Sequence, residues 1–194
     1  MREHPIIFSG PMVCAILEGR KTQTRRVMKP QPEGLVKRCP GLNEIRGASQ
    51  LWTDGVRVFS CPHGTPGDVL WARETWAPFP NDPARRVEYR AGYEAPGVRG
   101  HVPMWSKRWR PSIHMPRWAS RLTLRLTDVR VQRVQEISPE DAEAEGCWRT
   151  PDECSHVSIQ PPEFRDVWDS LNVKRGYGWD VNPFCWALTF EVKR

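Results

Sequence analysis

The chain has 194 residues, with 29 lysines and arginines against 23 acidic residues, and carries a formal net charge of +6 at pH 7. This length is typical of one domain with a sizeable core, so we expect a single domain over residues 1–194. Residues 1–5 show no signal-peptide pattern, and no apolar run reaches membrane length. These features argue against a membrane protein, and we expect a cytoplasmic one.

Six cysteines are scattered along the chain, and no pair has the CxxC spacing typical of a metal or redox site. In a cytoplasmic protein, reduced thiols are expected rather than disulfides. Cys39, Cys61 and His63 are the best candidates for zinc ligands, but they lack the paired short-loop spacing of structural zinc sites. We therefore expect no metal and no cofactor.

The first predicted elements are a short strand at 5–8 and a helix that begins near Pro11. Ser9 is placed to cap this helix, and a proline is tolerated in its first turn. Gly19 follows the last apolar residues of the helix and occupies a typical position for a helix end.

Residues 20–26, with the sequence RKTQTRR, place four cations and two threonines on one short turn. Such a cluster repels itself unless an anionic or electron-rich group lies between the charges. A solvated basic loop is the alternative interpretation. The alternation of hydroxyls with cations favours a binding site, and we expect Arg20, Arg25 and Arg26 to contact a ligand there.

Two segments rich in proline and glycine, 28–66 and 78–111, are interpreted as long insertions. The first contains a predicted hairpin, with strands at 51–52 and 56–59 around an Asp-Gly turn. The second contains a predicted strand at 87–91.

Between the insertions, residues 69–72 form a predicted buried strand that is followed by the sequence RETW. Glu74 is expected either to pair with an arginine of the basic turn or to line the binding pocket, and both alternatives stay open. Trp71 and Trp76 flank the apolar run, so we expect them in the core or in the wall of the pocket.

The longest predicted strand, 122–134, alternates leucines with polar residues, so one of its faces is buried. Ser138 then caps an acidic helix, and an amphipathic helix is predicted near 162–171. A strand at 185–192 follows. The apolar stripe of the second helix consists of Phe164, Val167, Trp168 and Leu171.

This order of elements predicts an α+β fold with a mainly antiparallel sheet. We expect the strands at 69–73, 122–134 and 185–192 to be neighbours in one curved sheet, with the helices at 11–18 and 139–145 at its rim or ends.

The stretch 107–121 mixes arginines with tryptophans and includes Arg117. Basic residues interleaved with aromatic ones are typical of sites for single-stranded nucleic acids or nucleobases. Tryptophans packed beside the stems of arginines are the alternative. We expect this stretch to form a positive surface with Arg25 and Arg26, and RNA affinity to fall steeply with salt.

Three segments, GRKTQTRR, GDVLWARETW and ISPEDAEAEG, follow one another in the order found in a known family. In this respect the chain resembles the ASCH domain, a β-barrel family of the PUA-like superfamily. PSIHMPRWASR and RGYGWDVNPFCWALTF are similar to prophage-encoded members, so the resemblance covers nearly the whole chain. It implies a PUA-like barrel with short helices at the rim and a pocket for a modified nucleoside or single-stranded RNA.

One branch of compact ASCH proteins consists of N4-acetylcytidine amidohydrolases. That likeness implies catalysis by Lys21 and Thr24 from the basic turn and by Glu145 from the acidic helix. Thr24 offers the nucleophile, Lys21 a base whose pKa neighbouring cations and burial lower, and Glu145 an acid or orienting group. An exposed acid on an acidic helix is the alternative for Glu145.

Two other functions fit the same pocket. One is a non-catalytic reader that binds RNA or a modified base, and the other is a ribonuclease on the same fold. The enzyme requires mutual contact between Thr24 and Lys21, whereas a reader requires only an aromatic and arginine-rich surface.

Overall fold

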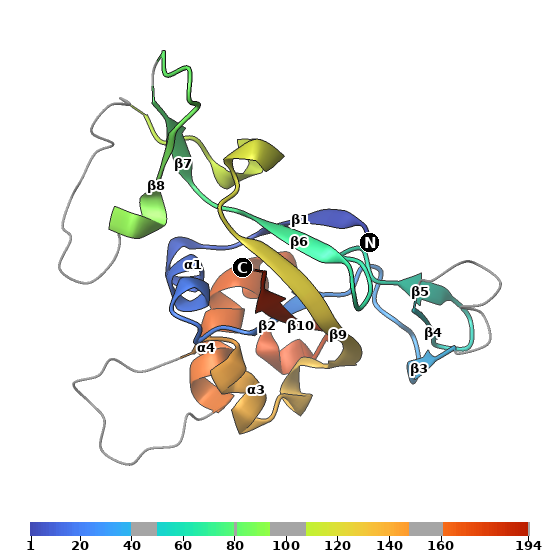
Figure 1. Ribbon diagram of the computed structural model, residues 1–194. Coiled ribbons are helices and arrows are strands. Elements are labelled where there is room, and N and C mark those ends of the chain that lie inside the picture. Colours follow the sequence, from blue (N-terminus) through green and yellow to red (C-terminus); the bar gives the residue numbers. More distant parts are fainter. Residues whose placement is uncertain (40–49, 80, 94–107, 148–160, 194) are drawn as a thin grey trace.

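The computed structural model describes residues 1–39, 50–79, 81–93, 108–147 and 161–193. Its centre is a five-stranded sheet (Figure 1). The strands, in spatial order, are β1 (Glu3–Ile7), β6 (Val69–Arg73), β9 (Thr123–Arg133), β10 (Phe184–Val192) and β2 (Gln23–Val27). In this sheet β1 and β6 are parallel, and the other neighbouring pairs are antiparallel. The predicted α+β class with a mainly antiparallel sheet is therefore confirmed.

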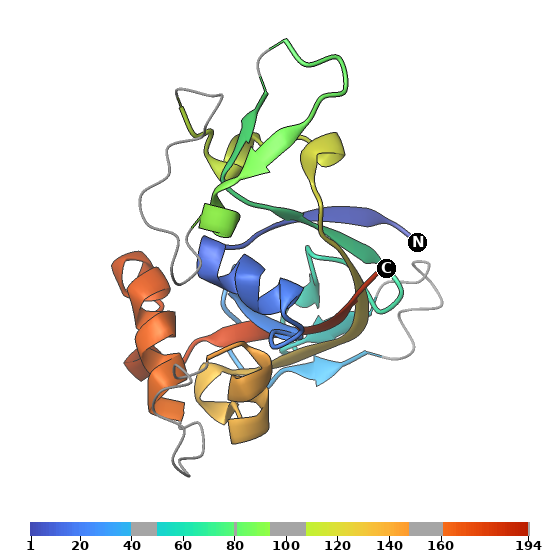
Figure 2. The ribbon, with the colours of Figure 1, turned by 60° about the vertical axis from the view of Figure 1, so that its left-hand side comes forward.

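The three strands predicted to be neighbours are adjacent as β6, β9 and β10. The predicted burial of one face of β9 is confirmed, because Leu124 and Leu126 are buried while Arg125 and Thr127 are exposed. The sheet curves around helix α1, Gly10–Leu17 (Figure 2).

The two faces of β10 pack against different groups of elements. Trp186, Leu188 and Phe190 belong to the main core, which also contains Val13 and Ile16 of α1. On the opposite face, small residues leave room for the helices α3 (Pro139–Ala144) and α4 (Pro161–Asn172). The core on this side joins Cys185 of β10 to Ala142, Phe164 and Trp168.

The outer strands β1 and β2 remain the edges of this sheet. Within the described residues no strand ladder joins them, although the resemblance implied a closed barrel. A side chain bridges this gap instead, since Arg26 donates a hydrogen bond of 2.6 Å to the carbonyl oxygen of Ile7. The sheet is open here at a seam between β1 and β2.

The first predicted insertion carries a three-stranded sheet of β3 (Lys37–Arg38), β4 (Leu51–Thr53) and β5 (Val58–Ser60). The predicted hairpin is present as β4 and β5, with its second strand beginning at Val58 rather than at Val56. Trp52 packs edge-on against Trp186 at 5.0 Å between ring centroids, so this sheet contributes to the main core.

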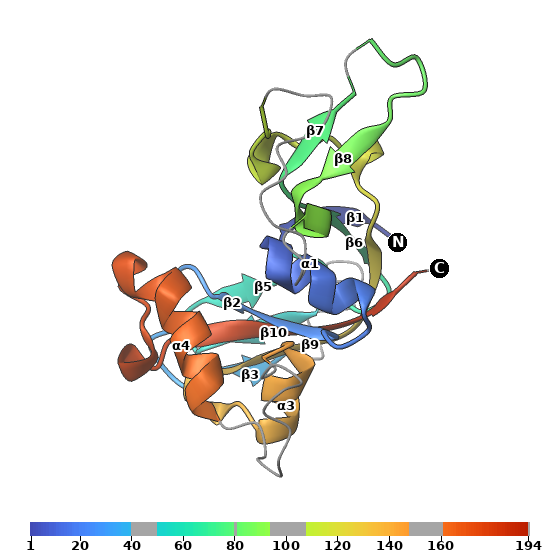
Figure 3. The ribbon, with the colours of Figure 1, turned by 90° about the vertical axis from the view of Figure 1, so that its left-hand side faces the viewer.

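In the second insertion, β7 (Trp76–Pro78) pairs with β8 (Val87–Tyr89). This hairpin projects away from the side that carries α3 and α4 (Figure 3). Short 3₁₀ helices complete the described chain, at Arg90–Tyr93, Ser112–His114, Arg117–Ala119, Val134–Glu136, Val173–Arg175 and Trp179–Val181. No helix among the described residues combines the length and the apolar character needed to cross a bilayer.

Two predictions about helices need correction. Ser9 precedes α1 without a side-chain capping bond, and its carbonyl oxygen instead accepts from the Val13 amide at 3.0 Å. In α4, Phe164 and Trp168 are buried as expected, but Val167 and Leu171 are 36% and 47% exposed. These two side chains line a cavity instead of packing in the core.

Candidate functional site

The site begins with the alternation of side chains along β2 and the residues before it. Lys21, Gln23 and Arg25 point to the face that carries α3, because side chains two residues apart in an extended segment share a face. Thr24 and Arg26 point to the opposite face. Ala187 on β10 lies beside Arg25 in the ladder and leaves space for the guanidinium group.

Lys21 and Glu145 form a buried ion pair although they are 124 residues apart. The Lys21 Nζ lies 2.8 Å from Glu145 Oε2 and donates a second hydrogen bond of 2.7 Å to the Glu145 carbonyl oxygen. The two residues are 1% and 6% exposed. Burial lowers the pKa of the Lys21 amine, and the Glu145 carboxylate only partly opposes this shift. The structure thus brings two of the three predicted catalytic residues together.

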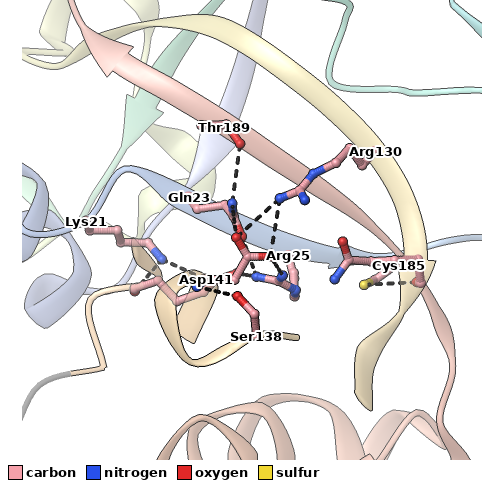
Figure 4. Close-up of polar contacts among 10 residues, drawn as sticks. Lys21, Gln23, Arg25, Arg130, Ser138, Asp141, Cys185 and Thr189 are labelled. Carbon is pink, nitrogen blue, oxygen red and sulfur yellow. Dashed lines mark hydrogen bonds and ion pairs between the residues drawn. The ribbon is translucent and has the colours of Figure 1, made fainter. Parts of the chain in front are cut away.

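Arg25 links this pair to Asp141 of α3. Its guanidinium contacts Glu145 Oε1 at 3.2 Å. It also contacts Asp141 Oδ2 at 2.6 Å (Figure 4). Asp141 also accepts from Gln23 at 3.0 Å and from Arg130. Its position is fixed by the start of the helix, where its amide donates to the Ser138 side chain as predicted for the cap. The network holds α3 against β2.

Asp141 makes the stability of the fold depend on pH in the acidic range. Burial raises its pKa, but hydrogen bonding by Gln23 and the charge of Arg25 outweigh burial and leave the pKa below its usual value. A carboxylate with a lowered folded-state pKa stabilises the fold above its unfolded-state pKa of about 3.9, and this contribution is lost as the pH falls through the folded value.

We therefore expect Asp141→Asn to destabilise the protein at neutral pH, and the difference from wild type to shrink as the pH falls below about 4. Urea unfolding across this pH range measures it. Asp166→Asn removes an exposed acid from α4 and is the matched control. A difference between wild type and Asp141→Asn that stays constant down to pH 2 would contradict this account.

A cavity of about 540 Å³ opens at the seam between the ends of β1 and β2 and is closed on one side by α4. Thr24, Arg26 and Glu145 all line it. Its other lining residues are Ile7, Phe8, Ser9, Met12, Arg25, Val27, Lys29, His63, Thr75, Ser112, Cys147, Phe164, Val167, Trp168, Leu171, Asn172 and Arg175. This volume is in the range of small-ligand sites.

Thr24 lies in the cavity wall, 2% exposed, on the opposite face of β2 from Lys21. The described residues contain no hydrogen bond between the two side chains. The chain is extended from Gln23 onward, so residues three apart do not share a face there. Glu145 is the group that both contacts Lys21 and reaches the cavity that Thr24 lines.

Gly146 allows Glu145 to approach Lys21. It has a positive φ of 78°, and a Cβ atom here would lie 3.1 Å from the Cβ of Lys21 and 3.2 Å from that of Ala15. Both the backbone conformation and the close approach therefore favour glycine at this position.

We expect Gly146→Ala to lower the free energy of unfolding by about 1–3 kcal/mol and to displace Lys21. Gly19→Ala is a matched control, because Gly19 has a similar φ of 76° but no atom within 4 Å of the added Cβ. It measures the backbone strain alone, about 1 kcal/mol. Equal losses in the two variants, measured by urea unfolding, would show that contact with Lys21 does not matter.

The other predicted binding residues lie apart from this cavity. Glu74 pairs bidentately with Arg121, at 2.8 and 2.9 Å, and lines a second cavity of about 260 Å³. Arg20 pairs with Glu18, and Arg117 pairs with Glu3 at 2.7 Å. Trp76 is buried beside Met115 and Ala119, while Trp71 is stacked by the guanidinium of Arg73. Of the arginines in the basic turn, only Arg25 and Arg26 line the larger cavity.

The basic and aromatic stretch is only partly described, since Lys107 lies outside the described residues. Arg110 stacks on Trp76, and Arg121 stacks on Tyr89 at 4.2 Å to the ring centroid. A continuous positive surface from this stretch to the cavity stays a prediction.

The candidate zinc ligands differ in their surroundings. Cys61 is buried, and burial raises its pKa to about 12, which keeps it a neutral thiol. His63 lines the larger cavity, and burial together with the charge of Arg26 and His4 lowers its pKa to about 4. No group of three potential metal ligands gathers within the described part of the chain.

Sequence reasoning missed several cavity residues, among them Lys29, Arg175 and the wall residues of α4. The wall residues of α4 could have been recognised, because the apolar stripe of this helix is wider than the face that packs on the sheet and so leaves apolar side chains exposed. Lys29 and Arg175 carried none, since they are separated by 146 residues and only the fold brings them to one cavity.

No family model matches the chain, and no curated protein matches it. A crystal structure of an Enterococcus faecalis V583 protein of family DUF984 is similar over 99% of this chain and 80% of that one, with 10% identity and a TM-score of 0.46. An ASCH domain from Lactobacillus crispatus JV V101 is similar over 98% and 79%, with 10% identity and a TM-score of 0.43. Neither likeness assigns an activity to this chain.

Proposed function

We propose that the cavity binds a cytosine nucleoside or its counterpart in single-stranded RNA, and that the protein hydrolyses an acyl group from its N4 amine. The observation that carries this proposal is the buried pair of Lys21 and Glu145 at the wall that Thr24 also lines. A buried amine with a lowered pKa and a nearby hydroxyl are the groups that amide hydrolysis requires.

In the proposed reaction, the Thr24 oxygen attacks the acyl carbonyl carbon and gives up its proton. Because no described hydrogen bond joins Thr24 to Lys21 directly, the proposal assigns the proton relay to Glu145, which pairs with Lys21 and lines the same cavity as Thr24. The bond from the carbonyl carbon to N4 then breaks, and the proton passes to the departing amine. Water hydrolyses the acyl group from Thr24 with the same two groups and restores the hydroxyl.

The test is incubation of the protein with N4-acetylcytidine, N4-acetylcytosine and a short RNA that contains the acetylated base. Mass spectrometry reads the products. We expect release of the acetyl group from at least one of them. Intact substrates after prolonged incubation with excess protein would refute the enzyme.

A binding protein without catalysis is the second candidate. It is favoured by the separation of Thr24 from Lys21 on opposite faces of β2 and by the aromatic wall of Phe8, Phe164 and Trp168. Saturable binding of the acetylated probes without turnover would establish it. Shortened RNA products in the same experiment would instead indicate a ribonuclease.

A further inference from the structure

Among the residues that the structure describes, three cations that line the cavity have no carboxylate within ion-pair distance: Arg26, Lys29 and Arg175. None of them forms an ion pair with any described acidic residue. The carboxylate in the cavity wall, Glu145, is already held by Lys21 and Arg25. No described carboxylate within ion-pair distance therefore compensates the positive charge of these three lining residues.

Each of the three is positioned by its own local structure. The Arg26 guanidinium lies 5.3 Å from the Phe8 ring centroid and donates to the Ile7 carbonyl. The Lys29 Nζ lies 5.1 Å from the ring centroid of Tyr177. Arg175 ends the 3₁₀ helix that follows α4, where Gly176 turns the chain with a φ of 79°. Aromatic rings orient two of these cations but leave their charge unneutralised.

Two of these cations, Arg26 and Arg175, interact electrostatically. Burial lowers the pKa of Arg26, and although the charge of Glu145 opposes this, the charge of Arg175 adds to it. Like charges held in one cavity destabilise each other, and an anion bound between them removes this cost. Arginine and lysine together provide the donors that recognise phosphate oxygens.

We infer that Arg26, Lys29 and Arg175 form a phosphate-binding subsite, so the cavity takes a nucleotide rather than an uncharged nucleoside. This inference rests on the proposed function in that the base and the phosphate share one cavity. The phosphate belongs either to a free nucleoside monophosphate or to the backbone of an RNA strand, and its oxygens accept hydrogen bonds from the three side chains.

The experiment measures binding by calorimetry at low salt. The probes are inorganic phosphate, the four ribonucleosides, their 5′-monophosphates and the four dinucleoside monophosphates with two identical bases, ApA, CpC, GpG and UpU. We expect at least one monophosphate or dinucleotide to bind about tenfold more tightly than its nucleoside, because charge-assisted hydrogen bonds are gained. A gain confined to monophosphates identifies a free nucleotide, and a gain shared by dinucleotides identifies RNA. This readout does not depend on hydrolysis, so failure of the proposed enzyme leaves it intact.

The matched variants are Arg175→Gln and Lys174→Gln. Both remove one exposed charge from the same 3₁₀ helix, but Lys174 does not line the cavity. We expect Arg175→Gln and Lys29→Gln each to weaken binding of the phosphate-containing probe about tenfold while leaving the affinity for the nucleoside unchanged. Lys174→Gln should change neither affinity. Equal losses at positions 174 and 175, equal affinities for nucleoside and nucleotide, or no binding of any phosphate probe would overturn the inference.

Discussion

Thr24→Ala is expected to lower kcat/KM for deacylation of N4-acetylcytidine by about a thousandfold or more, since removal of a nucleophile abolishes the covalent route. Substrate binding should change little, because the cavity keeps its cations and aromatic wall. The fold should also persist, because Thr24 takes part in the β2–β10 ladder through its backbone, opposite Leu188. Mass spectrometry of product and calorimetry of binding give the two readouts.

Two variants sharpen this test. Thr24→Ser keeps a hydroxyl at the same position and is expected to retain measurable turnover, whereas Thr127→Ala removes a hydroxyl from the exposed face of β9 and should have no effect. In the wild type, the rate should rise as the pH passes the lowered pKa of Lys21. Full activity in Thr24→Ala would remove the nucleophile from the proposal and leave a water-based reaction at Glu145.

Glu145→Ala is expected to lower the free energy of unfolding by about 3–5 kcal/mol, the usual cost of breaking a buried ion pair from one side. The reason is that one carboxylate neutralises two buried cations, Lys21 and Arg25. Removal of Glu145 leaves Lys21 with no described carboxylate within ion-pair distance, while Arg25 keeps Asp141. Urea unfolding at pH 7 measures the loss.

Lys21→Met provides the complementary measurement. Its loss should be smaller than that of Glu145→Ala, because Glu145 remains paired with Arg25 at 3.2 Å. Glu143→Ala removes an exposed acid from the same helix and should stay within about 0.5 kcal/mol of wild type. A Glu145→Ala protein as stable as Glu143→Ala would mean that water reaches Lys21 and that the site is not closed.

The parts of the fold that follow from local periodicity could be predicted from the sequence. The alternation in 122–134 predicted a strand with one buried face, and Ser138 predicted the start of α3. The contact between Lys21 and Glu145 came from the family resemblance, because neither residue carries a local signal for the other.

The predictions that failed depended on tertiary geometry. Glu74 does form an ion pair, but with Arg121, which precedes the long strand β9, rather than with the basic turn. The Lys21 amine was expected beside the Thr24 hydroxyl or beside Glu145. It pairs with Glu145, and the extended backbone of β2 places Thr24 on the other face. The open seam was also unpredictable, since whether two edge strands meet depends on the curvature of the whole sheet.

At the seam between β1 and β2, the residues that line the cavity include side chains that do not take part in the strand pairing. The ladders that hold the sheet together run from β1 through β6, β9 and β10 to β2. The cavity opens between β1 and β2, which no ladder joins within the described residues. The exposed side chains Lys29 and Arg175 line the cavity outside these ladders, so exchanging them breaks no strand pairing. If the proposed site binds a ligand there, substitutions at these two exposed positions are expected to change its preference at little cost to stability.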